Sequence, residues 1–220
     1  MDEDGQAGLL LFPLDEGADM TSEMRPSFLV DDRFTLAVEY AGRLHALQTR
    51  KSTRIPYICH PLGVASLVIE AGGDEDQAIG ALLHDIAEDC GGEPRLAEIR
   101  ILFGDRVEHI VRGCSDSLTE TEDQKASWSV RKAAHITHLA EADHDVLIVT
   151  AADKLHNARA IATEVQTVGD EVWKRFNRET SKELIISYYN QIYNILLKRE
   201  VTPTLLSPLK SAIAIMSGGA

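Results

Sequence analysis

Several features are scarce in this chain of 220 residues, and each scarcity argues against a class of protein. Cysteine occurs three times, at the separated positions 59, 90 and 114, so neither a disulfide framework nor a zinc knuckle is indicated and a reducing cytoplasm is the expected compartment. No apolar run reaches the roughly 18 residues that a membrane-spanning helix needs. No segment alternates polar and apolar residues for long enough to predict a β-sheet.

Basic residues are also few, with 22 lysines and arginines against 35 acidic residues and a net charge of −13. A nucleic-acid-binding surface needs a basic footprint, so we expect no nucleic-acid partner. Residues 1–30 carry a net charge of −6 and are predicted to be a poorly ordered acidic leader that docks on the domain or on a neighbouring subunit. The rest of the chain can still bind an anionic nucleotide where a few basic residues converge with a metal ion.

The periodicity of apolar residues is helical almost throughout. Asp31 can cap a first helix, and further helices are expected near 61–71, 74–90, 94–102, 104–115, 128–141, 144–165 and 180–198. Val-Leu-Ile-Val at 146–149 favours strands, but it runs directly into a helical pattern, so a buried helix is predicted there. The sequence therefore predicts an all-α domain over 31–198. Residues 199–220 are expected to be a tail, with residues 212–216 packed either on the bundle or in an oligomer contact.

Residues 84–89 read His-Asp-Ile-Ala-Glu-Asp and follow the apolar stretch 78–83. Burying a histidine and three carboxylates is costly unless they are paired, and a divalent cation is the simplest partner. On one helix His84 and Glu88 share a face, and Asp85 and Asp89 form the neighbouring pair. The alternative is a solvated acidic turn at a helix end.

A mononuclear metal site needs about two more nitrogen or oxygen ligands. His60 lies in Ile-Pro-Tyr-Ile-Cys-His-Pro, where Pro61 can open a helix. Asp153 is a lone acid after an apolar run. Taken singly, His60 could instead be a capping or core histidine, and Asp153 could simply pair with Lys154.

Taken together, these segments resemble the HD-domain metal phosphohydrolases, and within them the hydrolase domain of the Rel/Spo alarmone enzymes. The resemblance covers about residues 31–198 and implies an all-α HD-type helical bundle. The matching segments are HALQTRKSTRIPYICHP (45–61), LLHDIAED (82–89), FGDRV (103–107) and ADKLHNAR (152–159).

The resemblance implies one divalent ion, most simply Mn²⁺, held by four ligands: His60, His84, Asp85 and Asp153. It assigns water orientation and proton transfer to Glu88 and Asp89. The implied reaction removes the 3′-pyrophosphate of ppGpp or pppGpp, the alarmones of the stringent response, and gives GDP or GTP with pyrophosphate. No synthetase domain could fit after residue 198, so the chain resembles a stand-alone small alarmone hydrolase of the metazoan Mesh type.

The resemblance also implies nucleotide contacts from Arg50, Lys51, Asn157, Tyr188 and one member of the Arg131–Lys132 pair, expected to be Lys132. Without the family resemblance, Arg50 and Lys51 could form a solvated basic turn, and Tyr188 could pack in the core. The remaining histidines, including His135 and His138, are expected to be surface or helix-packing residues.

The segment 51–56 is one residue longer than in the long bifunctional enzymes, which puts the guanine preference in doubt. Adenine alarmones, the 2′-phosphate of NADPH and nucleoside 5′-monophosphates stay open as substrates. A sensor without turnover is a further alternative, although the presence of Glu88 and Asp89 argues against it. The acidic segment 115–127 is either a solvated loop or a flap over the site, and the oligomeric state is left open.

Overall fold

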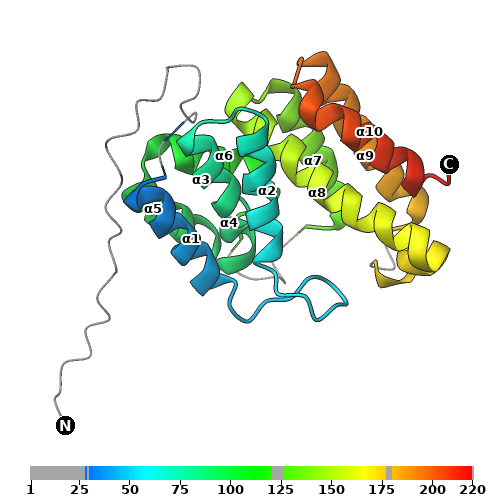
Figure 1. Cartoon of the computed structure of the whole chain (residues 1–220), viewed down its shortest axis with the longest axis horizontal. Coiled ribbons are helices and arrows are strands. Elements are labelled where there is room, and N and C mark those ends of the chain that lie inside the picture. The colour runs from blue at the N-terminus through cyan, green and yellow to red at the C-terminus, as the bar shows by residue number, and fades with distance from the viewer. Residues whose placement is uncertain (1–27, 29, 120–125, 177–179, 220) are drawn as a thin grey trace, which may run out of the picture.

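Helices and their connecting loops make up all of the chain that the computed structural model describes, namely residues 28, 30–119, 126–176 and 180–219 (Figure 1). No β-strand occurs in those ranges, so the predicted all-α fold is confirmed. The predicted leader lies almost entirely outside the described residues. The elements in chain order are α1 (Asp32–Leu44), α2 (Cys59–Glu70), α3 (Glu75–Leu83), α4 (Ile86–Cys90), α5 (Gly92–Phe103), α6 (Asp105–Cys114), α7 (Trp128–Glu141), α8 (His144–Val168), the 3₁₀ helix η3 (Gly169–Arg175), α9 (Lys182–Lys198) and α10 (Pro203–Met216).

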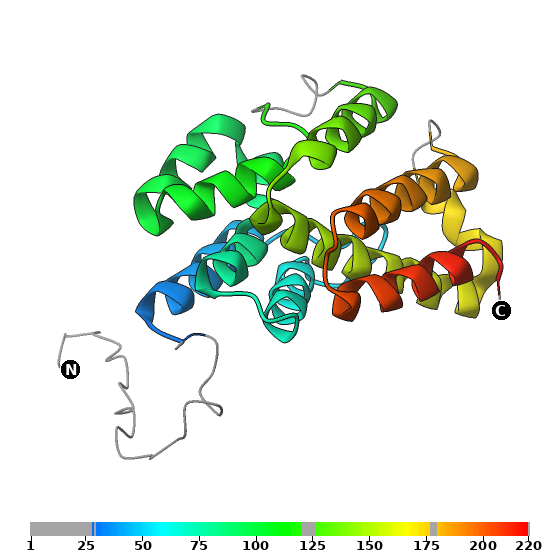
Figure 2. The same ribbon diagram turned by 90° about the horizontal axis from the view of Figure 1, so that it is seen from above.

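Helix α8 runs through the middle of the bundle, with α2, α3 and α6 packed against its first part and α9 and α10 lying along the remainder (Figure 2). The Asp143 carboxylate caps it by accepting from the backbone N–H of Val146 at 3.1 Å. Residues 146–153 are all buried. A helix that is covered on all sides can be apolar on all sides, so the β-prone stretch 146–149 forms a helix, as predicted.

The single helix predicted over 74–90 is wrong, because α3 ends at Leu83 and α4 begins at Ile86. His84 and Asp85 form the link between the two helices. In an unbroken helix, successive side chains point about 100° apart. The interruption instead lets the side chains of His84 and Asp85 approach the same point. Gly91, with a φ of 129°, then ends α4 in a conformation that favours glycine.

The loop between α1 and α2 is held by backbone hydrogen bonds that resemble those of a hairpin. The N–H of Arg50 donates to the Ile55 carbonyl at 2.9 Å, and the N–H of Tyr57 donates to the Gln48 carbonyl at 2.9 Å. These bonds return the chain to the start of α2. They therefore place residues 50 and 51 beside the same part of the molecule as His60.

Residues 199–220, expected to be a tail, contain helix α10, which packs along α8. Its buried residues include Leu205, Leu209 and Met216. Of the two placements left open for residues 212–216, the structure shows packing on the bundle; the domain boundary at residue 198 stays a prediction. Across the described ranges, no helix combines the length and the apolar character needed to cross a membrane.

Candidate metal and nucleotide site

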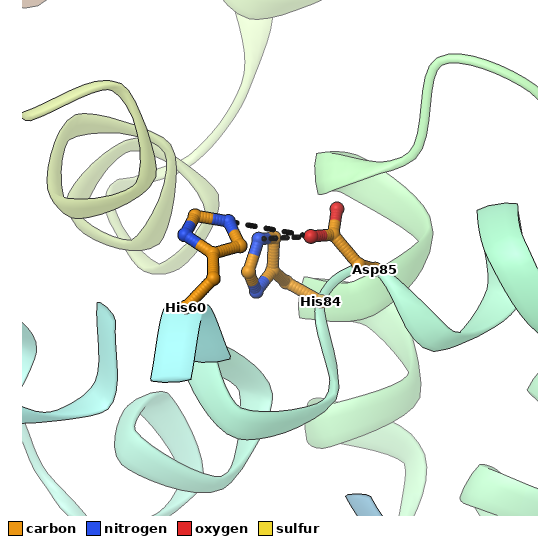
Figure 3. Close-up of side chains that lie close together, drawn as sticks. All are labelled: His60, His84 and Asp85. Carbon is orange, nitrogen blue, oxygen red and sulfur yellow. Dashed lines mark ion pairs between the residues drawn. The ribbon is translucent and has the colours of Figure 1, made fainter. Parts of the chain in front are cut away.

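Two imidazoles and two carboxylates from three parts of the fold converge on one point. His60 lies in the first turn of α2, and its Nε2 is 3.3 Å from Asp85 Oδ2 and 3.2 Å from Asp153 Oδ1. His84 Nε2 is 3.1 Å from the same Asp85 oxygen and 3.8 Å from the same Asp153 oxygen. Figure 3 shows both rings directed at one oxygen of Asp85. The four predicted ligands are therefore brought together.

The hydrogen bonding of the His84 ring fits a metal ligand. His84 Nδ1 lies 2.8 Å from the Ala81 carbonyl oxygen, which can only accept, so Nδ1 carries the proton and Nε2 a lone pair in the neutral ring. That Nε2 is buried, with no hydrogen-bond partner among the described residues. Two imidazole nitrogens with two carboxylate oxygens make a donor set for a borderline divalent cation such as Mn²⁺, Fe²⁺, Co²⁺ or Zn²⁺.

The electrostatics of the cluster favour positive charge at the same point. Burial by itself would lower the pKa of His84, but the carboxylates of Asp85 and Asp153 overcome it and raise that pKa to about 9. Burial opposes ionisation of Asp153 as well, yet the Lys154 ammonium and the neighbouring imidazoles lower its pKa. The carboxylates thus stay ionised and stabilise a cation between them.

Each carboxylate predicted to be a ligand accepts a hydrogen bond from a neighbouring side chain. The Tyr57 hydroxyl donates to Asp85 Oδ2 at 2.6 Å. Asn157 Nδ2 donates to Asp153 Oδ1 at 2.5 Å, and Lys154 Nζ donates to Asp153 Oδ2 at 2.6 Å. Such contacts orient metal ligands. Sequence analysis assigned no role to Tyr57, although it lies three residues before His60 in a segment that matches the family.

The ring of His156 lies behind His60, with their Nδ1 atoms 2.9 Å apart. This contact depends on Gly63, because a Cβ atom at that position would lie 2.4 Å from the His156 ring. His156 therefore contacts a predicted ligand from behind.

Glu88 and Asp89, predicted to be catalytic, differ in their surroundings. Glu88 faces the cavity, where burial and the nearby Asp116 carboxylate raise its pKa to about 7. The Asp116 backbone N–H and Arg131 Nη1 donate to its oxygens at 3.4 and 3.5 Å. Asp89 is exposed, and its Oδ2 accepts from Gln48 Nε2 at 2.7 Å. The structure therefore places Glu88 directly against the cavity.

A cavity of about 420 Å³ opens in front of the cluster. Its walls include Asp85, Asp153 and Glu88, together with all five predicted nucleotide contacts: Arg50, Lys51, Lys132, Asn157 and Tyr188. The cavity lining thus combines basic and acidic groups in equal number, in a chain that is acidic overall.

The predicted nucleotide contacts lie on different walls. Arg50 Nη2 donates to Asn157 Oδ1 at 2.6 Å, which ties the loop before α2 to α8. Lys51 Nζ lies 5.9 Å from the centre of the Phe176 ring. Lys132 Nζ lies 5.3 Å from the centre of the Tyr188 ring on the wall formed by α7 and α9. Tyr188 is 7% exposed, so it belongs both to the core and to the cavity.

Several other cavity residues were not singled out from sequence. Arg175 in η3 and Phe176 just after it line the cavity, and no spacing rule connects them with the metal motifs. Lys154 lines the cavity as well, and it lies inside the matched segment 152–159. His135, expected to be a surface or packing residue, is buried and lines the cavity as well. Its position three residues after Lys132, on the same helix face, was the available signal.

The start of the acidic segment 115–127 is not a solvated loop. The Asp116 side chain is 3% exposed and forms ion pairs with Arg131 and Lys132. Those lysine and arginine charges lower the pKa of Asp116 to about 2 against the opposing effect of burial. The centre of the segment, where a flap was considered, lies outside the described residues.

Comparison with known proteins yields a family and several relatives. The family model described as "HD domain" matches residues 37–182. The chain is 30% identical over 179 residues to a Synechocystis protein named a probable guanosine-3′,5′-bis(diphosphate) 3′-pyrophosphohydrolase. It is 36% identical over 126 residues to the Xenopus tropicalis protein named guanosine-3′,5′-bis(diphosphate) 3′-pyrophosphohydrolase MESH1. The first alignment covers 81% of this chain and 22% of the relative, and the second covers 56% and 66%.

Solved structures share the fold. A metazoan orthologue of SpoT, described as hydrolysing ppGpp, superposes with a TM-score of 0.68 at 24% identity, covering 87% of this chain and 98% of that one. A Listeria monocytogenes protein superposes with a TM-score of 0.58 at 29% identity, covering 70% and 96%. These matches support the all-α HD architecture predicted from the sequence.

Proposed function

Because this chain belongs to the HD-domain family, we propose that it is a metal-dependent hydrolase that removes the 3′-pyrophosphate from ppGpp and pppGpp, leaving GDP or GTP. One observation carries the proposal. The Nε2 atoms of His60 and His84 and the carboxylates of Asp85 and Asp153 converge at the wall of a cavity lined by all five predicted nucleotide contacts. The names of the Synechocystis and Xenopus relatives support the same substrate.

We assign one divalent cation, Mn²⁺ by preference, to the four ligands, and the cytoplasm as the compartment. The cation, when bound, polarises a phosphoryl oxygen and lowers the pKa of water. Nitrogen and carboxylate donors in equal number suit Mn²⁺, and the His60–His84–Asp85 group found among the described residues contains no cysteine.

The reaction adds water across the bond between ribose O3′ and phosphorus. Water attacks the phosphorus attached to O3′, the P–O3′ bond breaks, and pyrophosphate departs while O3′ takes up a proton. Glu88 is the group that accepts the proton of the attacking water, because a carboxylate with a pKa of about 7 is well matched to neutral pH. Asp89, held by Gln48, assists proton transfer from the solvent side of α4.

The substrate is bound with its base near the loop of Arg50 and Lys51 and its pyrophosphate near the cluster. Arg50 is fixed by its bond to Asn157, so its guanidinium is preorganised for stacking on the base or binding the 5′-phosphates. Lys132 and Tyr188 line the opposite wall, where a second anionic group can be held.

The test is turnover of a substrate panel by the Mn²⁺-loaded protein, with the products resolved by chromatography. The panel contains ppGpp, pppGpp, ppApp, NADPH and nucleoside 5′-monophosphates. Release of intact pyrophosphate from ppGpp is the expected result, and faster release from ppApp would shift the assignment to adenine alarmones. Release of orthophosphate only, with the 3′-pyrophosphate left on the ribose, would reject the proposal in favour of a nucleotidase.

A further inference from the structure

His135 is a buried polar side chain at the wall of the cavity. It lies on α7, is 5% exposed and lines the cavity. Neither of its ring nitrogens has a hydrogen-bond partner among the residues that the structure describes. Buried polar atoms are normally paired, because an unpaired one loses its bond to water without compensation. The His135 imidazole is therefore placed to form a hydrogen bond with a ligand that enters the cavity.

The hydroxyl of Tyr188, on α9, is in the same situation. It is buried and has no hydrogen-bond partner in the described part of the chain. The rings of His135 on α7 and Tyr188 on α9 lie with their centres 6.5 Å apart and their planes tilted by 48°. Two unpartnered groups at one end of the cavity indicate a polar group of a ligand more strongly than either does alone.

The surroundings of the two rings indicate an anionic ligand group. The ammonium groups of Lys132 and Lys154 lie 5.3 and 5.9 Å from the centre of the Tyr188 ring. Both lysines already form ion pairs, Lys132 with Asp116 and Lys154 with Asp153. The imidazole and the phenol are thus the donors that have no hydrogen-bond partner among the described residues, and the two ammonium groups beside them favour an anionic ligand.

We infer that His135, together with Tyr188, donates a hydrogen bond to the terminal phosphoryl group of the pyrophosphate, the one farther from the ribose. This rests on the proposed function. The phosphorus under attack must lie at the four ligands, and Lys154 adjoins the ligand Asp153. The next phosphoryl group along the pyrophosphate can therefore reach the pocket between α7 and α9. His135 is a substrate-binding residue in this arrangement and takes no part in proton transfer.

The protonation state of His135 agrees with this role. Burial lowers its pKa to about 3, with Lys154 and Lys132 acting in the same direction. The ring is therefore neutral at physiological pH and offers one N–H donor and one lone pair. A neutral donor can bind a phosphoryl oxygen without forming an ion pair that would hold the product too tightly.

The experiment compares His135→Leu and His135→Gln with His138→Leu, a control on the exposed face of the same helix. Binding of inorganic pyrophosphate and of orthophosphate to the Mn²⁺-loaded proteins is measured by calorimetry. His135→Leu should weaken pyrophosphate binding by about 10- to 100-fold, as for the loss of a hydrogen bond to a charged group. It should leave orthophosphate binding unchanged. His135→Gln, which keeps a donor, should recover part of the loss, and His138→Leu should match the unmodified protein.

A stability measurement separates binding from folding. Leucine removes an unpaired buried polar group, so the metal-free His135→Leu protein should melt at the same temperature or higher. Unchanged pyrophosphate affinity, or equal weakening for pyrophosphate and orthophosphate, would overturn the inference. A lowered melting temperature would overturn it too, because His135 would then be a structural residue.

Failure of the proposed function would be distinguishable. In that case the unmodified protein would release no pyrophosphate from ppGpp, whatever residue stands at position 135. Where ppGpp is a substrate, His135→Leu should also raise its KM, and an unchanged KM would count against the inference alone.

Discussion

Replacing Glu88 by glutamine should make the protein more stable and nearly inactive at the same time. The Glu88 side chain is 22% exposed, and its pKa is raised from an ordinary value of 4.5 to about 7, mainly by burial. Each pKa unit corresponds to about 1.4 kcal/mol, so ionised Glu88 costs the folded state on the order of 3 kcal/mol. Glutamine has nearly the same shape and never ionises. The ion pair between Glu88 and Arg131 is long, at 3.5 Å, so its loss in the variant offsets little of the gain in stability.

The sign of the pH dependence follows from the raised pKa. Between pH 4.5 and 7 the folded protein retains a proton on Glu88 that the unfolded chain has lost, so the stability of the unmodified protein falls as the pH rises. At pH 4 both proteins should be equally stable. At pH 8 the variant should melt about 6–12 °C higher, at roughly 2–4 °C per kcal/mol for a chain of this size.

Thermal melts of chelator-treated protein at pH 4 and pH 8 measure this difference, with Glu141→Gln on the exposed end of α7 as the charge-removal control. In the Mn²⁺-loaded enzyme, Glu88→Gln should lose about 10²–10⁴-fold in kcat while keeping its metal content. Two results would refute the reasoning: a melting difference that is the same at both pH values, or loss of metal together with activity. The latter would make Glu88 a ligand.

Further predictions concern the ligands, their support and the nucleotide. His84→Ala or Asp153→Ala should lose both bound metal and turnover, which measurements of metal content and activity check. Chelation of the unmodified protein should lower its melting temperature, because a bound ion stabilises the folded state by mass action, and melting curves check this. Tyr57→Phe, which removes the 2.6 Å bond to a ligand carboxylate, should weaken metal affinity by about 10- to 100-fold in a metal titration; unchanged affinity would show that the bond does not matter. Arg50→Ala should raise the KM for ppGpp with a smaller change in kcat. Arg54→Ala, at an exposed position in the same loop, should change neither constant. An equal effect of the two substitutions would indicate a nonspecific effect of charge.

The fold class was readable from the chain because it depends on local patterns. Apolar residues at helical spacing and capping residues such as Asp31, Asp74 and Asp143 mark helices whose partners need not be known. The family motifs likewise named the four ligands before their geometry was known. The structure shows their imidazole nitrogens 3.1 to 3.8 Å from their carboxylate oxygens, and their roles stay a prediction for the metal titration.

The break between α3 and α4 could not be read in this way. Residues 74–90 have continuous helical periodicity, and nothing in their sequence marks His84 and Asp85 as a link. The interruption is set by contacts with distant segments. Asp85 accepts a hydrogen bond from the Tyr57 hydroxyl, and its Oδ2 lies 3.3 Å from His60 Nε2. Local propensity is a weak signal that such tertiary contacts override.

The resemblance named Lys132 and Tyr188 on the far wall of the cavity, but their surroundings were decided by tertiary structure. His135, Lys154 and Tyr188 are distant in sequence, and spacing along the chain does not show that they meet. Only the packing of α7 and α9 beside α8 brings two paired lysines to one end of the cavity, together with an imidazole and a phenol that have no hydrogen-bond partner in the described part of the chain. Most of the helices and the candidate metal-binding motifs could be predicted from the chain, because these depend on spacing along it. The shape and polarity of the pocket depend on which side chains meet across helices, and that is a property of the folded molecule.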